Sequence, residues 1–314
     1  MPPILFFLLA IVVLLFCSGG YIFLLACRAG KKVDWLDETR VKKTPYGIYN
    51  EYIQASHRWL KEHNAQDVYI KSYDGLQLHG YWIPADQPRG TVLMAHGYRS
   101  TMLIDFHLAF ELFHRLGMNI LVPEQRTHGQ SGGKYITFGV KESRDMYNWL
   151  EFYDQELGKG PIVLYGISMG ASTMLYLADK ILPGDVRGII ADCGFTSPAQ
   201  IISSVYRRVI RLPARISLWM TSLLAKIFAG FGLWEKDTRK ILKKSRYPVL
   251  LIHGGNDGFV PCEMTKQAFA VCKEPKKLLI VENADHGLSF VVDGMAYTAA
   301  IMDFLNIYVV TKNR

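Results

Sequence analysis

The sequence predicts an α/β protein built on a doubly wound, mostly parallel sheet of eight strands. Three observations indicate this class. Short runs rich in Val, Ile and Leu alternate with longer helix-like runs along the chain, as in proteins with parallel sheets. Most of the short runs are apolar throughout, which is typical of strands buried on both faces. The sequence Gly166-Ile167-Ser168-Met169-Gly170 joins one such run to a helix-like run, which indicates a sharp strand-to-helix turn.

The predicted elements follow from these patterns. The first two strands form a hairpin, because Asp74-Gly75 between them is a strong turn dipeptide. The eight strands are expected at 68–73, 76–84, 91–96, 119–124, 161–168, 188–192, 248–253 and 277–282. The helices are expected at 44–63, 102–116, 140–157, 169–181, 263–271 and 290–309.

A chain of 314 residues is long enough for one large α/β domain with an anchor and an insert. Half of the residues are hydrophobic, which argues against disorder. The predicted division is 1–27 for an apolar anchor, 28–66 for a basic, helical linker, 67–195 and 248–314 for the α/β domain, and 196–247 for a helical cap.

The N-terminal segment predicts a transmembrane helix. Residues 1–27 contain no charged side chain, and a helix over 4–27 would be about 36 Å long, enough to cross a bilayer. The segment lacks the basic start and short apolar core of a signal peptide. Arg28, Lys31 and Lys32 follow it, so the positive-inside tendency favours a cytoplasmic α/β domain. A single helix leaves the opposite face open.

The predicted cap carries the chain's positive charge. Residues 196–247 hold eleven Lys and Arg against two acids, a local charge of +9, so the rest of a chain of net charge +8 is close to neutral. Pro213 separates two predicted helices. The apolar stripe of the first comprises Ile201, Ile202, Val205, Tyr206, Val209 and Ile210, opposite Ser203, Ser204, Arg207, Arg208 and Arg211. The stripe of the second comprises Ile216, Trp219, Met220, Leu223, Leu224, Ile227, Phe228 and Phe231.

Two interpretations fit this cap. In the first, the apolar faces cover the mouth of an active site and the basic faces are solvated. In the second, the basic faces also rest on anionic lipid headgroups, and the apolar faces receive an acyl chain. A nucleic-acid partner is disfavoured, because aromatic platforms and a recognised binding module are missing from the sequence.

Three predicted strand ends carry the residue types of a serine hydrolase. Ser168 ends one strand, Asp257 follows the strand at 248–253, and His286 follows the strand at 277–282. Reactive groups gather at the carboxyl ends of parallel strands. His286 would take the Ser168 proton, and Asp257 would orient the imidazole and stabilise its charged form. His96-Gly97-Tyr98 ends another strand, so the Tyr98 and Met169 amides are expected to bind the oxyanion.

These motifs resemble those of α/β-hydrolases of the serine aminopeptidase and monoacylglycerol-lipase-like type, with prolyl-oligopeptidase relatives. They are most similar to bacterial membrane-anchored members carrying D-G-x-x-L-H-G, H-G-Y, G-x-S-M-G, H-G-x-x-D-x-x-V-P and D-H, over about 67–309. The resemblance implies Ser168 as nucleophile, Asp257 as acid and His286 as base, with Tyr98 and Met169 at the oxyanion. The 126–132 loop matches the family's R-G-H-G-x-S-x pattern, with Thr127 in place of glycine.

Alternatives exist for the nucleophile and the acid. Ser131 also lies in a Gly-x-Ser-x-Gly pattern, but no predicted strand ends there and no helix begins, so a loop role is expected. Asp192 ends another strand and would serve as the acid if its loop reached His286. Asp285 adjoins the base, and its side chain is expected to point elsewhere. His96 and His253 are expected to be structural, bonded to backbone groups.

Cysteine and histidine spacing gives no support for a disulfide framework or a zinc site. Three of the five cysteines (Cys193, Cys262 and Cys272) lie at irregular spacing beyond the apolar N-terminus. Cys193 follows a strand and is expected to be a small buried residue. The nine histidines show no zinc-binding spacing.

The sequence therefore predicts a membrane-tethered, cofactor-free serine hydrolase that cleaves carboxylic esters, acyl or lipid-like, through an acyl-enzyme. A serine peptidase with the same triad is the first alternative, followed by an acyltransferase or thioesterase. A catalytically silent, membrane-tethered binding protein is the alternative from another class. The natural substrate and the oligomeric state are left open.

Overall fold

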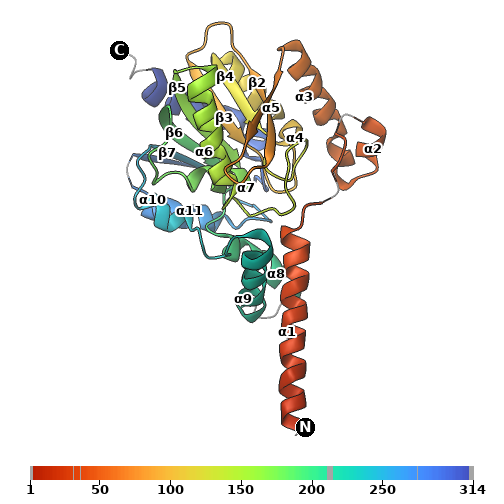
Figure 1. Ribbon diagram of the computed structural model, residues 1–314. Coiled ribbons are helices and arrows are strands. Elements are labelled where there is room, and N and C mark those ends of the chain that lie inside the picture. Colours follow the sequence, from red (N-terminus) through yellow and green to blue (C-terminus); the bar gives the residue numbers. More distant parts are fainter. Residues whose placement is uncertain (1–2, 31, 36, 211–214, 274, 311–314) are drawn as a thin grey trace.

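The computed structural model describes residues 3–30, 32–35, 37–210, 215–273 and 275–310, apart from the side chains of 3–12, 14, 15, 45, 209 and 210. Pro213 and Arg211 therefore lie outside the described residues. A central sheet of eight strands organises the chain (Figure 1). The strands are β1 (Gln66–Lys71), β2 (Gln77–Ile83), β3 (Gly90–Ala95), β4 (Met118–Pro123), β5 (Pro161–Ile167), β6 (Asp185–Asp192), β7 (Val249–Gly254) and β8 (Lys276–Val281).

The strand order is β1-β2-β4-β3-β5-β6-β7-β8. β2 pairs antiparallel with β1 and β4, and every other neighbouring pair is parallel. The hairpin closes around Gly75, whose φ of 84° is a left-handed conformation that glycine adopts without cost. The predicted eight-stranded, mostly parallel sheet is confirmed.

Helices cover both faces of the sheet, and for this reason β3, β4, β5 and β7 are buried along their whole length. One hydrophobic core includes residues of α3, α4, α5 and α13, and a second includes residues of α6, α7, α10 and α11. These helices are α3 (Asn50–Glu62), α4 (Met102–Asp105), α5 (His107–Arg115), α6 (Glu142–Phe152), α7 (Met169–Leu175), α10 (Thr238–Leu242), α11 (Cys262–Val271) and α13 (Gly294–Leu305). Short helical segments are α2 (Glu38–Lys42), η1 (Pro45–Tyr49), η2 (Tyr153–Leu157), α12 (Ser289–Val292) and η4 (Asn306–Val310).

Helix α7 is shorter than the sequence pattern predicts. The expected helix extends to residue 181, whereas α7 ends at Leu175. Beyond this point, carbonyls bond outside the helix: the Arg246 amide donates to the Ala178 carbonyl, and the Lys236 ammonium donates to the Tyr176 carbonyl. These partners replace the hydrogen bonds that would continue the helix.

An insert between β6 and β7 lies beside the N-terminal helix. The insert contains α8 (Pro198–Ile210), α9 (Arg215–Leu224), η3 (Ala225–Ala229) and α10, and the N-terminal helix is α1 (Pro3–Cys27). Figure 1 shows α8 and α9 next to the C-terminal part of α1, while the N-terminal part of α1 extends beyond them. Among the described residues, no helix combines the length and the hydropathy that a membrane span requires.

Helix α9 differs from the expectation that its apolar stripe covers an active-site mouth. Trp219 and Leu223 are exposed, as are Ile216, Ile227 and Phe228. The buried face includes the small polar residues Ser217 and Thr221, which contact α1. The reason is steric: Gly19 and Gly20 of α1 allow close approach, so Met220 and Leu224 of the stripe lie against α1 beside these small residues, and the exposed residues of the stripe point outward.

Candidate active site

Ser168 lies on a strained turn at the end of β5. Its φ of 56° and ψ of −116° are unfavourable for a residue with a side chain. The flanking glycines make the turn possible. A Cβ at Gly166 would lie 2.4 Å from the Gly170 carbonyl carbon, and a Cβ at Gly170 would lie 1.8 Å from the Ala95 oxygen. Close packing of β5, α7 and β3 therefore fixes the hydroxyl at the carboxyl end of the sheet.

The structure brings the three predicted catalytic side chains together. His286 Nε2 lies 2.9 Å from Ser168 Oγ, and His286 Nδ1 lies 2.7 Å from Asp257 Oδ2. Both distances are those of hydrogen bonds. The imidazole therefore lies between a hydroxyl and a carboxylate, an arrangement in which it can accept the hydroxyl proton while the carboxylate stabilises the resulting imidazolium.

The Asp257 carboxylate is held by two loops and a buried histidine. Its Oδ1 accepts hydrogen bonds from the Phe259 and Val260 amides at 2.8 and 2.7 Å. Its Oδ2 lies 3.1 Å from His253 Nε2. Burial by itself would raise the pKa of Asp257, but the hydrogen bonds from His253, His286 and the Phe259 amide hold that pKa well below its ordinary value. The side chain is therefore a carboxylate at neutral pH.

The two histidines expected to be structural have different surroundings. His96 lies 2.9 Å from the Gly97 carbonyl and accepts from the Gln125 amide, and burial lowers its pKa to about 3. It is bonded to the backbone, as expected. His253 lies near the Val260 carbonyl, and it also contacts the Thr265 hydroxyl and the Asp257 carboxylate. This contact with Asp257 was not predicted from the sequence, because it depends on a tight loop after β7.

The alternatives for the acid and the nucleophile form hydrogen bonds elsewhere. Asp192 accepts hydrogen bonds from the Tyr297 and Ser289 hydroxyls at 3.0 and 3.4 Å. Asp285 accepts from the Gly258 amide at 2.8 Å and the His286 amide at 2.7 Å, so it links the loop of Asp257 to the loop of His286. Ser131 is buried and donates to the Glu124 carbonyl.

The Tyr98 and Met169 amides, which were expected at the oxyanion, lie in the loop after β3 and at the start of α7. Among the described residues, neither amide donates to a protein acceptor. Gly97 lies beside the nucleophile, since a Cβ there would be 3.5 Å from Ser168 Cβ. The loop is held by Asp105, which accepts from the Gly97 amide and the Ser100 hydroxyl, each at 2.6 Å. Sequence reasoning missed Asp105, because a carboxylate near a helix start reads as an ordinary surface residue.

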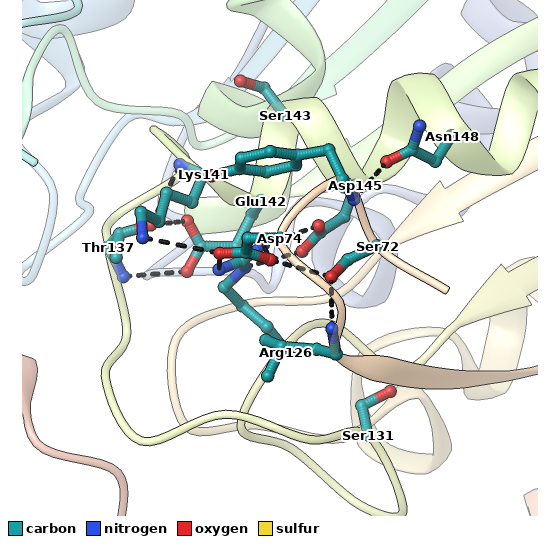
Figure 2. Close-up of polar contacts among 12 residues, drawn as sticks. Ser72, Asp74, Arg126, Ser131, Thr137, Lys141, Glu142, Ser143, Asp145 and Asn148 are labelled. Atoms are coloured by element: carbon teal, nitrogen blue, oxygen red, sulfur yellow. Dashed lines mark hydrogen bonds and ion pairs between the residues drawn. The ribbon is translucent and has the colours of Figure 1, made fainter. Parts of the chain in front are cut away.

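A buried ionic network shapes the loop after β4. Figure 2 shows Arg126 between Asp74 and Asp145, with contacts of 3.0 and 2.6 Å. In the same view, the buried Glu142 accepts from the Thr137 amide and hydroxyl and from the Gly139 amide. This network fixes the segment that presents Phe138, whose ring stacks on Tyr98 at 5.3 Å.

Thr127 is the position at which the chain departs from the family's loop pattern. Its φ is 74°, a conformation that a β-branched residue rarely adopts. Its amide donates to the Gly132 carbonyl at 2.8 Å. The loop thus keeps the left-handed geometry at this position although the residue is not glycine.

A cavity of about 290 Å³ opens beside Ser168. Its walls come from α1, α8, the oxyanion loop and the loops after β4, β6 and β7, and they are mainly apolar. The lining residues are Tyr21, Ile22, Leu25, Ala26, Tyr98, Arg99, Phe138, Ser168, Phe195, Ile201, Ile202, Val205, Tyr206 and Phe259. Such a lining suits an acyl chain or another apolar group.

One group of three metal-type donors is present among the described residues. Ligand atoms of Cys193, Asp257 and His286 lie within 4.8 Å of one another. Burial raises the pKa of the Cys193 thiol well above its ordinary value, and a protonated thiol is a poor ligand. His286 Nδ1 and Asp257 Oδ2 are already hydrogen-bonded to each other.

Comparisons with known proteins agree with this architecture. The family model described as serine aminopeptidase, S33, matches residues 86–228. The uncharacterized protein YqkD of Bacillus subtilis is 29% identical over 238 residues, which cover 76% of this chain and 78% of that protein. The uncharacterized membrane protein YNL320W of Saccharomyces cerevisiae is 27% identical over 203 residues, covering 64% of this chain and 65% of that protein.

Solved structures share the fold. An esterase of Pyrococcus furiosus, Pf2001, has a TM-score of 0.65 at 22% identity, and the match covers 80% of this chain and 94% of the esterase. Mouse alpha/beta hydrolase domain-containing protein 10 has a TM-score of 0.56 at 19% identity, covering 77% and 99%. The strand order and the solved structures agree, so the chain has the α/β-hydrolase fold.

Proposed function

We propose that this protein is a serine hydrolase that cleaves carboxylic esters with an acyl or lipid-like group. The observation that carries the proposal is the hydrogen-bonded series Ser168–His286–Asp257, which opens onto an apolar cavity. The family match and the esterase fold support a hydrolase. The proposed catalytic residues are Ser168, His286 and Asp257, with the Tyr98 and Met169 amides at the oxyanion.

The geometry suits a two-step reaction through an acyl-enzyme. Ser168 Oγ attacks the ester carbonyl carbon while His286 Nε2 takes the hydroxyl proton. The carbonyl oxygen becomes an oxyanion that accepts hydrogen bonds from the Tyr98 and Met169 amides. As the carbonyl re-forms, the C–O bond to the alcohol breaks, and His286 returns the proton to the departing oxygen. Water, deprotonated by His286, then releases the acid by the reverse sequence.

The composition of the cavity favours an ester over a peptide. The family description names aminopeptidases, and recognition of a peptide's free amino group requires a carboxylate or an equivalent acceptor near the scissile bond. Among the described residues that line the cavity, Arg99 is the charged one, and it is positive. A cationic amino terminus would be repelled there, whereas an acyl chain would be buried.

We further propose that the chain is tethered to a membrane by its N-terminal segment. The support is the absence of charged side chains from 1–27 and the basic residues that follow. The yeast relative is named as a membrane protein. The same basic residues favour a hydrolase domain on the cytoplasmic face. Protease protection of sealed, right-side-out vesicles tests this arrangement: digestion of the domain before lysis would place it on the outer face.

A fluorophosphonate probe tests the catalytic proposal. The full chain should become covalently labelled, and Ser168→Ala should abolish the labelling. Ser131→Ala is the matched control, because Ser131 lies in the other Gly-x-Ser-x-Gly pattern and its hydroxyl bonds to the backbone of His79 and Glu124, not to the triad. An unlabelled wild-type protein would indicate a binding protein instead of an enzyme.

A second measurement separates esterase from peptidase. Turnover of p-nitrophenyl esters and of aminoacyl amides by the same preparation should favour the esters. Faster turnover of the amides than of every ester would overturn the ester assignment while leaving the triad in place.

A further inference from the structure

Two segments far apart in sequence form the walls of the cavity beside Ser168. Ile201, Ile202 and Val205 of α8 form one wall. Ile22 and Leu25, in the last turns of α1, form the other. The N-terminal helix is therefore in contact with the site and is more than a linker to it.

Close contacts between small residues fasten α1 to the cap. Ser18 Oγ lies 2.9 Å from Ser217 Oγ, and the Thr221 hydroxyl donates to the Gly19 carbonyl at 3.1 Å. A Cβ at Gly19 would lie 2.5 Å from Met220 Cβ, closer than two carbon atoms approach. The position of α1 against α9 therefore depends on a glycine at this position.

The end of α1 is also bonded to the oxyanion loop. The Arg99 guanidinium donates to the Leu25 carbonyl at 2.8 Å and to the Arg28 carbonyl at 2.9 Å. The Tyr98 hydroxyl donates to the Ala26 carbonyl at 2.8 Å. These donors satisfy carbonyls that the end of a helix leaves unpaired. As a result, α1 is held on one side by the cap and on the other by residues that adjoin the reaction centre.

We propose that α1 is part of the substrate site and that its Ile22 and Leu25 side chains set the length of acyl chain that the enzyme accepts. This inference rests on the proposed ester hydrolysis. An acyl chain bound at Ser168 would extend between α1 and α8, where each additional buried methylene increases kcat/KM about fourfold until the cavity is full.

A matched pair of leucines tests this role in the full chain. Leu24 and Leu25 are adjacent in α1 and similarly exposed, at 53% and 57%, but only Leu25 lines the cavity. The measured quantity is the ratio of kcat/KM for p-nitrophenyl decanoate to that for p-nitrophenyl acetate. Leu25→Trp, which fills the cavity from the α1 side, should lower this ratio about tenfold or more. Leu24→Trp should leave it within about twofold.

A matched pair of glycines tests the same idea without touching the cavity lining. Gly19→Ala should displace α1 from α9 and lower the decanoate-to-acetate ratio. Gly20→Ala should leave it unchanged, because a Cβ at Gly20 would make only an ordinary contact of 3.8 Å with Leu224. Equal ratios in all four variants and the wild type would reject the role of α1.

The labelling experiment distinguishes this failure from that of the proposed function. Retained fluorophosphonate labelling with unchanged ratios would reject only the inference about α1. Loss of both labelling and ester turnover in the wild-type protein would reject ester hydrolysis, and the inference about α1 with it.

Discussion

The catalytic centre and the α1–cap region are stabilised in different ways. At the centre, buried polar groups are bonded to one another at short distances, as in the Asp257 carboxylate with its two amides and two imidazoles. In the α1–cap region, contacts between small residues hold two helices together while large side chains such as Trp219 are 62% exposed. The difference agrees with the two proposals made above, in which the strand ends carry the chemistry and the packed pair of helices carries the choice of substrate.

The largest expected effect lies at the centre. Asp257→Asn should lower kcat about 10⁴-fold, because an amide that donates to His286 Nδ1 would hold the imidazole in the wrong tautomer. Steady-state turnover of a p-nitrophenyl ester measures this loss. Asp192→Asn is the control, since Asp192 bonds to Tyr297 and Ser289, and its kcat should fall less than tenfold. A larger loss in Asp192→Asn than in Asp257→Asn would assign the acid to Asp192.

Adding one methyl group in each region should change the free energy of unfolding by different amounts. Gly170→Ala places a Cβ 1.8 Å from the Ala95 oxygen, so the free energy of unfolding should fall by about 3 kcal/mol. Gly20→Ala in α1 meets ordinary contacts and should change it by less than about 1 kcal/mol. Denaturant titration of both variants measures the difference. Similar values would show that the centre tolerates repacking as readily as α1 does.

A smaller effect is expected on the pH dependence of stability, through His79 of β2, which lies next to the edge strand β1. His79 is buried between Asp67 and Glu124, at 2.8 and 2.7 Å. Burial would lower the pKa of His79, but hydrogen bonds to the two carboxylates raise it above its ordinary value. A raised folded-state pKa contributes stability that is complete below about pH 6.5 and is lost as the pH rises through the folded pKa.

The His79→Gln variant checks this pH dependence. The wild-type free energy of unfolding should decline as the pH rises above about 6.5, and the variant should show a shallower decline over the same interval. Parallel curves for the two proteins would mean that other groups cause the dependence.

The smallest effect concerns exposure of the cap to lipid. If the outward stripe of α9 contacts a bilayer, brominated lipids should quench Trp219 in the full chain reconstituted in vesicles. Trp219→Phe should then remove part of the quenched fluorescence. Trp59→Phe should not, because Trp59 is stacked on Phe110 of α5, and Figure 1 shows α3 and α5 well apart from α9. Equal quenching of the two variants would contradict contact between the outward stripe of α9 and the bilayer.

The sheet was predictable because buried parallel strands leave an unmistakable apolar pattern. All eight strands were expected within about three residues of their ends. The meeting of Ser168, Asp257 and His286 was also expected, since each follows a strand and parallel strands end at one edge.

Contacts that depend on three-dimensional packing were not predictable. Asp105 and Glu142 resemble surface acids in the sequence, yet both are bonded to backbone amides near the site. The outward orientation of the apolar stripe of α9 was not predicted, because periodicity identifies the apolar side of a helix but not the element or solvent that this side contacts. The cavity wall formed by α1 was missed because a run of apolar residues indicates burial in lipid or in protein equally well.

The carboxylate of Asp285 couples the loop that carries Asp257 to the loop that carries His286. It holds the amide of Gly258 in the acid loop and the amide of His286 in the base loop. The two loops are therefore coupled through one side chain, which keeps the imidazole and its carboxylate partner aligned. On heating, the two loops should release as a unit, and the loss of activity should follow a single exponential.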